Sequence, residues 1–129
     1  MVLEGKGFFI WKISRCENGD QQAIANLAQA SQFTHVLVKI ADTVNSSNVD
    51  DNIDLVPPLI ESLHRLGIQV WGWHYVRGDY PVTEANKAIE RVTSLGLDGY
   101  AIDAEKEYQN PSILMSKPNK CSRTIIITC

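Results

Sequence analysis

Two acidic residues, Asp103 and Glu105, stand one residue apart where a short apolar run, residues 99–104, gives way to polar sequence. Because side chains alternate along a strand, both carboxylates are expected on one face, roughly 7 Å apart along the backbone. Two carboxylates whose surroundings separate their pKa values can act as a protonated general acid and a charged partner. Chemistry in α/β proteins gathers at the C-terminal ends of parallel strands, so this pair is the candidate catalytic site.

The same residues also fit a different structure, the start of a helix. Asp103 would then be the N-cap, and the acidic residues after it would interact favourably with the helix dipole. The apolar run directly before Asp103 favours the strand end, and the helix start remains the alternative.

Four strand-like apolar segments recur about every 30 residues, which is the length of a βα unit. They are expected at residues 8–13, 34–41, 68–76 and 99–104. Helical patterns separate them, the first capped by Asp20, the second beginning at Asp54 and ending at Gly67, and the third capped by Thr83 and closed by Gly96. The second helix has prolines at positions 57 and 58, in its first turn. The expected apolar faces comprise Ile24, Leu27, Ala28 and Ser31, then Leu59, Ile60, Leu63 and Leu66, then Ala85, Ala88, Ile89 and Val92.

This alternation of strands and helices predicts an α/β fold with a parallel sheet and right-handed crossovers. A closed TIM-type barrel needs eight such units and about 250 residues, whereas this chain has 129 residues and four units. We therefore expect residues 1–109 to form the first half of a TIM-type (β/α) barrel, as a truncated barrel or, alternatively, as a complete small open sheet. Residues 110–129 are expected to be an irregular tail in which 124–128 fit either a fifth strand or a sticky exposed segment.

Lys39 is the one charged side chain within the second expected strand. Alternation assigns Val36, Val38 and Ile40 to the side that faces the helices, and Leu37, Lys39 and Ala41 to the other side. A lysine within an apolar run needs a carboxylate partner, and Asp103 is the functional candidate for it. The alternative is that Lys39 extends its ammonium group to water at the sheet edge.

Aromatic residues cluster near the end of the third expected strand, as Trp71, Trp73, His74 and Tyr75, and Trp11 stands on the first. Aromatic rings at strand ends are typical of carbohydrate sites, because sugar rings offer C–H surfaces for stacking. Large aromatic residues also dominate buried cores. We assign Trp71 to the core, and we predict that Trp73, His74, Tyr75 and Trp11 join Lys39 in binding the substrate.

Composition excludes several classes of function. The net charge of −3, without a cluster of Lys and Arg, gives no footprint for nucleic acid. No stretch is apolar enough to predict a membrane span, and Lys12 interrupts the apolar start that a signal peptide would need, so we expect a cytoplasmic location. We expect no cofactor and no metal, since dinucleotide and zinc motifs are lacking. Cys16, Cys121 and Cys129 predict reduced thiols.

Three strand motifs resemble those of glycosidase barrels. The sequence DGYAIDAE (98–105) resembles the fourth-strand signature of chitinase-type and muramidase-type (lysozyme-like) barrels, in which an Asp-x-Glu pair ends the strand. The sequences THVLVKIA (34–41) and GIQVWGWHY (67–75) bring the likeness closer to the muramidase type. The resemblance covers about residues 8–108.

The resemblance implies that Glu105 is the general acid that protonates the glycosidic oxygen. Asp103 would orient or stabilise a positively charged intermediate, which the substrate's own acetamido group can form. Two positions depart from the families. Chitinase-type sites carry an Asp where this chain has Ala101, and muramidase-type barrels carry an Asp on the first strand, which here reads FFIWKI. These departures leave the exact reaction open.

The expected function is acid-assisted hydrolysis of glycosidic bonds in a polysaccharide, N-acetylated in the families resembled, once further strands complete the barrel. Half a barrel lacks half of the active-site wall, so the 129-residue chain alone is expected to be inactive. The alternatives are a catalytically inactive glycosidase-like protein and a self-contained flavodoxin-like binding domain. The expected partners are a carbohydrate and, through exposed sheet edges, further copies of the chain.

Overall fold

The computed structural model of the chain describes residues 3–104 and the backbone of residues 123–127. It is a mixed α/β fold in which a parallel sheet and three α-helices alternate along the chain. Glu105 and most of the expected tail, residues 110–129, lie outside the described residues. The strands of the parallel sheet are β1 (Gly7–Ile10), β2 (His35–Asp42), β6 (Gln69–Val76) and β7 (Gly99–Ala104), and they lie side by side in this order.

Three helices connect these strands: α1 (Gln21–Ala30), α2 (Val56–Arg65) and α3 (Pro81–Leu95). Asp20 caps α1 as expected, since its Oδ1 accepts a hydrogen bond of 3.0 Å from the backbone N–H of Ala23. Gly67 and Gly96 follow α2 and α3 with positive φ of 71° and 63°, where a residue without Cβ ends a helix most easily.

Two helix starts differ from the expected ones. The second helix begins at Val56, and Asp54 precedes it, with its Oδ1 accepting from the Val56 N–H at 3.1 Å. The third begins at Pro81, so the predicted cap at Thr83 is wrong. Proline suits the first helical position because its missing N–H would have had no partner there.

The first strand is shorter than residues 8–13 predicted. It ends at Ile10, and a short 3-10 helix, η1 (Ile13–Arg15), follows and buries Ile13. A second one, η2 (Glu17–Gly19), leads into α1.

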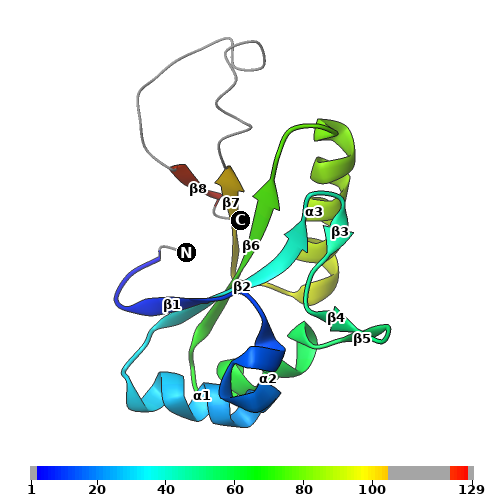
Figure 1. Cartoon of the computed structure of the whole chain (residues 1–129). Helices are drawn as coiled ribbons and strands as arrows, with labels where there is room; N and C mark the ends of the chain where they lie inside the picture. The colour runs from blue at the N-terminus through cyan, green and yellow to red at the C-terminus, as the bar shows by residue number, and fades with distance from the viewer. Residues whose placement is uncertain (1–2, 105–122, 128–129) are drawn as a thin grey trace.

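The segment between β2 and α2 contains short strands. β3 (Asn45–Ser46) pairs antiparallel with the end of β2, and β4 (Val49–Asp50) forms a hairpin with β5 (Ile53–Asp54). Near the other end of the chain, β8 (Arg123–Ile127) pairs antiparallel with β7 (Figure 1). Part of the expected irregular tail is therefore an antiparallel strand.

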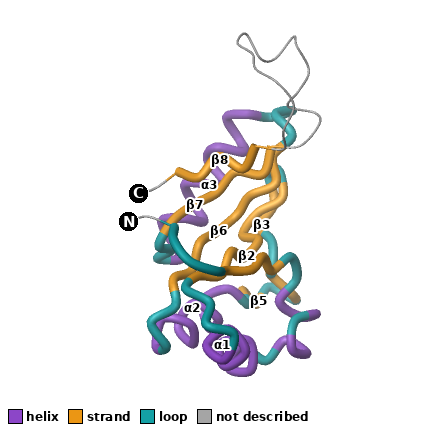
Figure 2. The backbone as a smooth tube through the Cα atoms, turned by 90° about the vertical axis from the view of Figure 1, so that its left-hand side faces the viewer, coloured by secondary structure: helices purple, strands orange, loops and turns teal. Residues whose placement is uncertain are grey.

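All three described helices pack against one face of the sheet, which we call the helix face. A single apolar cluster joins side chains of α1, α2 and α3 to those of the strands. Figure 1 shows α1 and α2 together below β1 and β2, and Figure 2 shows the strands as one strongly twisted layer with α3 alongside. The cluster includes Ile24, Ala28, Leu59, Leu63 and Leu95 from the helices and Val36, Val38, Ile40, Val70 and Tyr100 from the strands.

Two residues expected in the core are exposed, Leu27 on α1 and Ile89 on α3. The buried side of α3 carries Glu84, Arg91 and Leu95, whereas Ala88 and Val92 of the expected face are only half-buried against the core and Ile89 is exposed. Hydrophobic periodicity located the helix correctly, but it did not predict that the polar residues Glu84 and Arg91 are buried on it.

A β-bulge interrupts β2 between Lys39 and Ala41. The extra residue lets two consecutive side chains, Ile40 and Ala41, both enter the helix-face core. Asp42 thereby returns to the side of Lys39, and their side chains meet at 2.6 Å. The expectation that Ala41 shares a face with Lys39 is therefore wrong, because simple alternation does not hold across a bulge.

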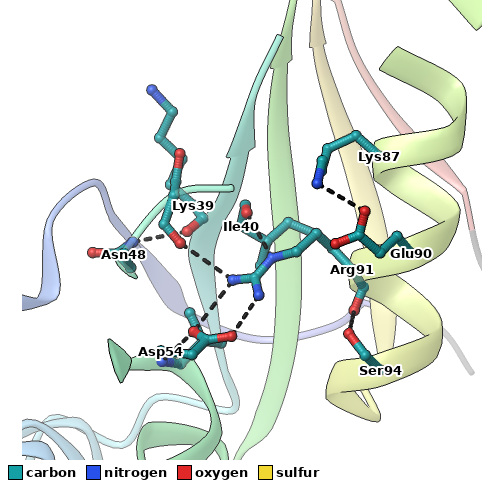
Figure 3. A network of polar contacts seen from close by, with 10 residues as sticks. Lys39, Ile40, Asn48, Asp54, Lys87, Glu90, Arg91 and Ser94 are labelled. Carbon is teal, nitrogen blue, oxygen red and sulfur yellow. Dashed lines mark hydrogen bonds and ion pairs between the residues drawn. The ribbon is translucent and has the colours of Figure 1, made fainter. Parts of the chain in front are cut away.

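Arg91 of α3 is buried and reaches the bulge. Its Nε donates to the carbonyl oxygen of Ile40 at 2.9 Å, and its Nη2 donates to the carbonyl oxygen of Ser47 at 3.2 Å (Figure 3). Two further bonds, of 2.5 and 3.3 Å, run to the carboxylate of Asp54. One guanidinium group therefore holds α3, the bulge of β2 and the segment before α2 together.

Replacing Arg91 with Met should lower the free energy of unfolding by about 3 kcal/mol, because it leaves a partly buried carboxylate and two carbonyl groups without their donor. Lys87→Met is the matched control on the same helix. Lys87 forms an ion pair of 2.7 Å with Glu90, whose side chain is 60% exposed, and such surface pairs contribute about 0–1 kcal/mol. Urea denaturation of both variants measures the difference. Equal losses would contradict the anchoring role of Arg91.

Candidate functional site

The sheet face opposite the helices, which we call the aromatic face, has its residues in three levels. Strand register sets Leu37, Trp71 and Gly99 side by side, then Lys39, Trp73 and Ala101, then Asp42, Tyr75 and Asp103. The last level lies at the C-terminal ends of the strands, where α/β proteins place their ligands.

The lowest level is a small core of its own. Trp71 is fully buried and packs with Leu3, Leu37 and Ala101, which confirms its assignment to the core. Gly99 makes room for it, since a Cβ there would come within 2.3 Å of the Trp71 ring. This level closes the aromatic face at the N-terminal end of the strands.

Lys39 occupies the middle level, inside a group of aromatic rings. Its ammonium nitrogen lies 5.6 Å from the centre of the Trp11 ring, 5.2 Å from Trp73 and 5.6 Å from Tyr75. Each ring face attracts a cation, and the attraction is stronger where water is excluded. The side chain of Lys39 is only 8% exposed, so it does not extend to water at the sheet edge.

The carboxylate that Lys39 contacts is Asp42, at 2.6 Å, and not Asp103 as the sequence suggested. Sequence reasoning missed Asp42 because it ended the second expected strand at residue 41. The bulge explains why Asp42 contacts Lys39, since without it Asp42 would point to the helix face.

Asp103 lies within β7, in register with Tyr75, so it is part of a strand and does not begin a helix. Its side chain is half-buried at the C-terminal end of the aromatic face. Arg77 follows Tyr75 by two residues, and its guanidinium carbon lies 5.7 Å from the centre of the Tyr75 ring. The expected catalytic partner, Glu105, is outside the described residues.

Two exposed aromatic side chains extend the face along β1. Trp11 is 65% exposed, and Phe9 is 60% exposed with its ring edge-on to Trp73 at 6.2 Å. The indole N–H of Trp73 donates to the carbonyl oxygen of Ile10 at 3.2 Å, which fixes this ring against the end of β1. Phe9 was missed, although its position two residues before Trp11 is the signal that places both on one face.

His74 lies on the helix face, so the prediction that it shares a side of the sheet with Lys39 and Tyr75 is wrong. Consecutive residues of a regular strand point in opposite directions, and His74 is directly followed by Tyr75. Its ring lies 2.7 Å from the carbonyl oxygen of Thr43 through Nε2, which must therefore donate, and 2.8 Å from the Tyr100 hydroxyl through Nδ1. Burial lowers the pKa of His74, although the bond to Thr43 opposes the shift. His74 is thus a neutral, fully buried group.

An apolar groove of about 420 Å³ lies beside His74, between α3 and the strands β6 and β7. Val76, Ile89 and Ile102 are among its lining residues. The carboxylate of Glu84, which also lines the groove, is bonded within the protein, since it accepts from the backbone N–H groups of residues 77 and 78 at 3.2 and 3.0 Å. The groove offers apolar surface, whereas the aromatic face combines rings with charged groups.

Two absences hold for the part of the chain that the structure describes. No three or more His, Cys, Asp or Glu side chains are grouped so that they could hold a metal ion. No helix there is both long and apolar enough to cross a membrane.

Comparison with protein-family models, with curated proteins and with solved structures finds no match to this chain. A function therefore has to be argued from the geometry of the aromatic face and from the strand motifs.

The neutral state of His74 predicts how stability depends on pH. Its pKa lies below 6.5 in the folded protein and near about 6.5 in the unfolded chain. As the pH falls through about 6.5, the unfolded chain binds a proton that the folded protein does not, so the free energy of unfolding should fall until the pH reaches the folded pKa.

Chemical denaturation between about pH 7.5 and pH 5 tests this dependence. His74→Gln should flatten the fall, while the same change at the more exposed His64 should leave it in place. An unchanged pH profile in His74→Gln would show that another group is responsible.

Proposed function

We propose that this chain is a glycosidase-like half barrel whose aromatic face binds a carbohydrate. The observation that carries the proposal is the winding of the sheet: β1, β2, β6 and β7 follow one another in chain order, and all three described helices pack on one side. In a doubly wound, flavodoxin-like sheet the helices cover both faces. In a TIM-type barrel they cover the outside only, and the other face is the barrel interior. The winding thus favours the barrel over the flavodoxin-like alternative.

The chemistry of the aromatic face supports a sugar as the ligand. Trp11, Trp73 and Tyr75 offer ring surfaces for the C–H faces of sugar rings, and the first of these is largely exposed. Lys39 and Asp42 supply charged groups beside these rings for hydroxyl or acetamido groups. Aromatic side chains, with a few polar or charged groups that fix orientation and give specificity, are the usual composition of a ligand site.

For hydrolysis, we propose Glu105 as the general acid and Asp103 as the residue that stabilises the charged intermediate, as the resemblance to muramidase-type and chitinase-type barrels implies. Four parallel strands supply half the wall of an eight-stranded barrel. Turnover is therefore assigned to a barrel that further strands complete, and sugar binding to the chain alone. A catalytically inactive glycosidase-like protein remains the second candidate, favoured by the departures at Ala101 and on the first strand.

Binding is tested by titrating the chain with soluble oligosaccharides, including oligomers of N-acetylglucosamine, in isothermal titration calorimetry. Trp11→Ala should weaken binding by about 5- to 10-fold, because it removes one stacking ring. Ile53→Ala is the control, since Ile53 is also 65% exposed but lies on the β4–β5 hairpin. Equal effects of the two variants would contradict a site on the aromatic face.

The catalytic roles are tested in a protein in which further strands complete the barrel. There Glu105→Gln should lower the hydrolysis rate by at least about 100-fold, the lower range for a lost general acid. Asp103→Asn should also be severe, because it removes the charge beside the developing cation. Unchanged turnover in Glu105→Gln would remove Glu105 from the mechanism.

A further inference from the structure

The side-chain amide of Asn48 bridges β1 and β2 just beyond the point where their backbone register ends. Its Nδ2 donates to the carbonyl oxygen of Trp11 at 3.2 Å and to that of Lys39 at 2.7 Å. Trp11 and Lys39 directly follow Ile10 and Val38, the last residues paired between the two strands. Its Oδ1 accepts from the backbone N–H of Ile13 at 2.8 Å. The amide therefore continues the contact between the strands by one further step.

Asparagine suits this position in two ways. Two carbonyl groups need two N–H donors, and one backbone N–H needs an acceptor, which a primary amide supplies together. A carboxylate of the same shape would set an oxygen against both carbonyl groups. The backbone of Asn48 also has a φ of 59°, in the left-handed region that asparagine tolerates better than most residues.

The two carbonyl groups belong to residues whose side chains meet on the aromatic face. The Lys39 ammonium lies 5.6 Å from the centre of the Trp11 ring. Figure 3 shows Asn48 beside the Lys39 backbone, with the Lys39 side chain extending away from it. Trp11 follows the last residue of β1 and is mostly exposed, so packing alone does little to fix its ring.

We infer that Asn48 is a positioning residue of the aromatic face, which holds the Trp11 ring over the Lys39 ammonium group. The effect of Asn48 on ligand affinity rests on the proposed function. The effect of Asn48 on the position of the Trp11 ring does not rest on it, because the contact between this ring and Lys39 exists without any ligand.

The first experiment measures the contact in the ligand-free chain, as the nuclear Overhauser effect between the Trp11 indole and the Lys39 ε-methylene protons. Asn48→Gly keeps the backbone conformation and removes the amide, and Asn48→Asp keeps the shape and removes the donors. The control is Ile60→Val, which trims a buried side chain of α2. At a temperature where all the variants are folded, the signal should persist in wild type and in Ile60→Val, and should disappear in both Asn48 variants. Its persistence in both Asn48 variants would overturn the inference, and so would its loss in Ile60→Val.

The second experiment is a double-mutant cycle with an N-acetylglucosamine oligomer as the probe. Asn48→Gly should weaken binding by about 5- to 10-fold, like Trp11→Ala. The double variant should bind no more than about 2-fold more weakly than Trp11→Ala alone, because both changes remove the same contact. Fully additive losses would overturn the inference. If wild type binds no oligosaccharide, the proposed function fails, and the nuclear Overhauser measurement still decides the role of Asn48.

Discussion

The β-bulge in β2 is the constraint on which both faces of the sheet depend. It directs Ile40 and Ala41 together into the core under the helices, and it returns Asp42 to the side of Lys39. Without the extra residue the lysine would lie among aromatic rings without this carboxylate, which is costly for a buried charge. The bulge is held from the helix face by the guanidinium group of Arg91, which donates to the Ile40 carbonyl oxygen. A single irregularity thus links the packing of α3 to the charge arrangement on the opposite face.

Sequence reasoning located the strands and helices because each rests on a local signal. Asp20 as a cap, Gly67 and Gly96 as helix ends, and apolar runs as strands each need only neighbouring residues. The assignment of side chains to one or the other face of the sheet failed at the bulge, where the signal is not local. Nothing in the order of Ile40 and Ala41 marks a bulge, because it arises from the pairing of β2 with β6. The placement of His74 was wrong for a simpler reason, since strict alternation with its neighbour already excludes it from the aromatic face.

The candidate site was predictable in composition but not in its connections. Trp11, Lys39, Trp73 and Tyr75 were singled out from the sequence, and the structure brings the three rings around the ammonium group. The carboxylate partner, Asp42, was not predicted because its position depends on the bulge. The amide that joins the ends of β1 and β2, Asn48, was not predicted because it lies in a loop whose composition shows only that it is polar. The groove beside α3 differs from the aromatic face. Its histidine, His74, is buried, neutral and bonded on both ring nitrogens, so the groove offers a ligand mainly apolar contacts.

The claim that the aromatic face is the binding surface is tested most directly by the indole N–H signals of the tryptophans in a nitrogen-15 correlation spectrum, titrated with N-acetylglucosamine oligomers. All three tryptophans lie on this face, but Trp71 is fully buried at its base and serves as an internal reference. The account predicts that the Trp11 and Trp73 signals move together along one binding curve, while the Trp71 signal moves much less. Signals of both residues that stay fixed up to the solubility limit of the sugar, while backbone signals around Ile89 in the groove shift, would contradict it.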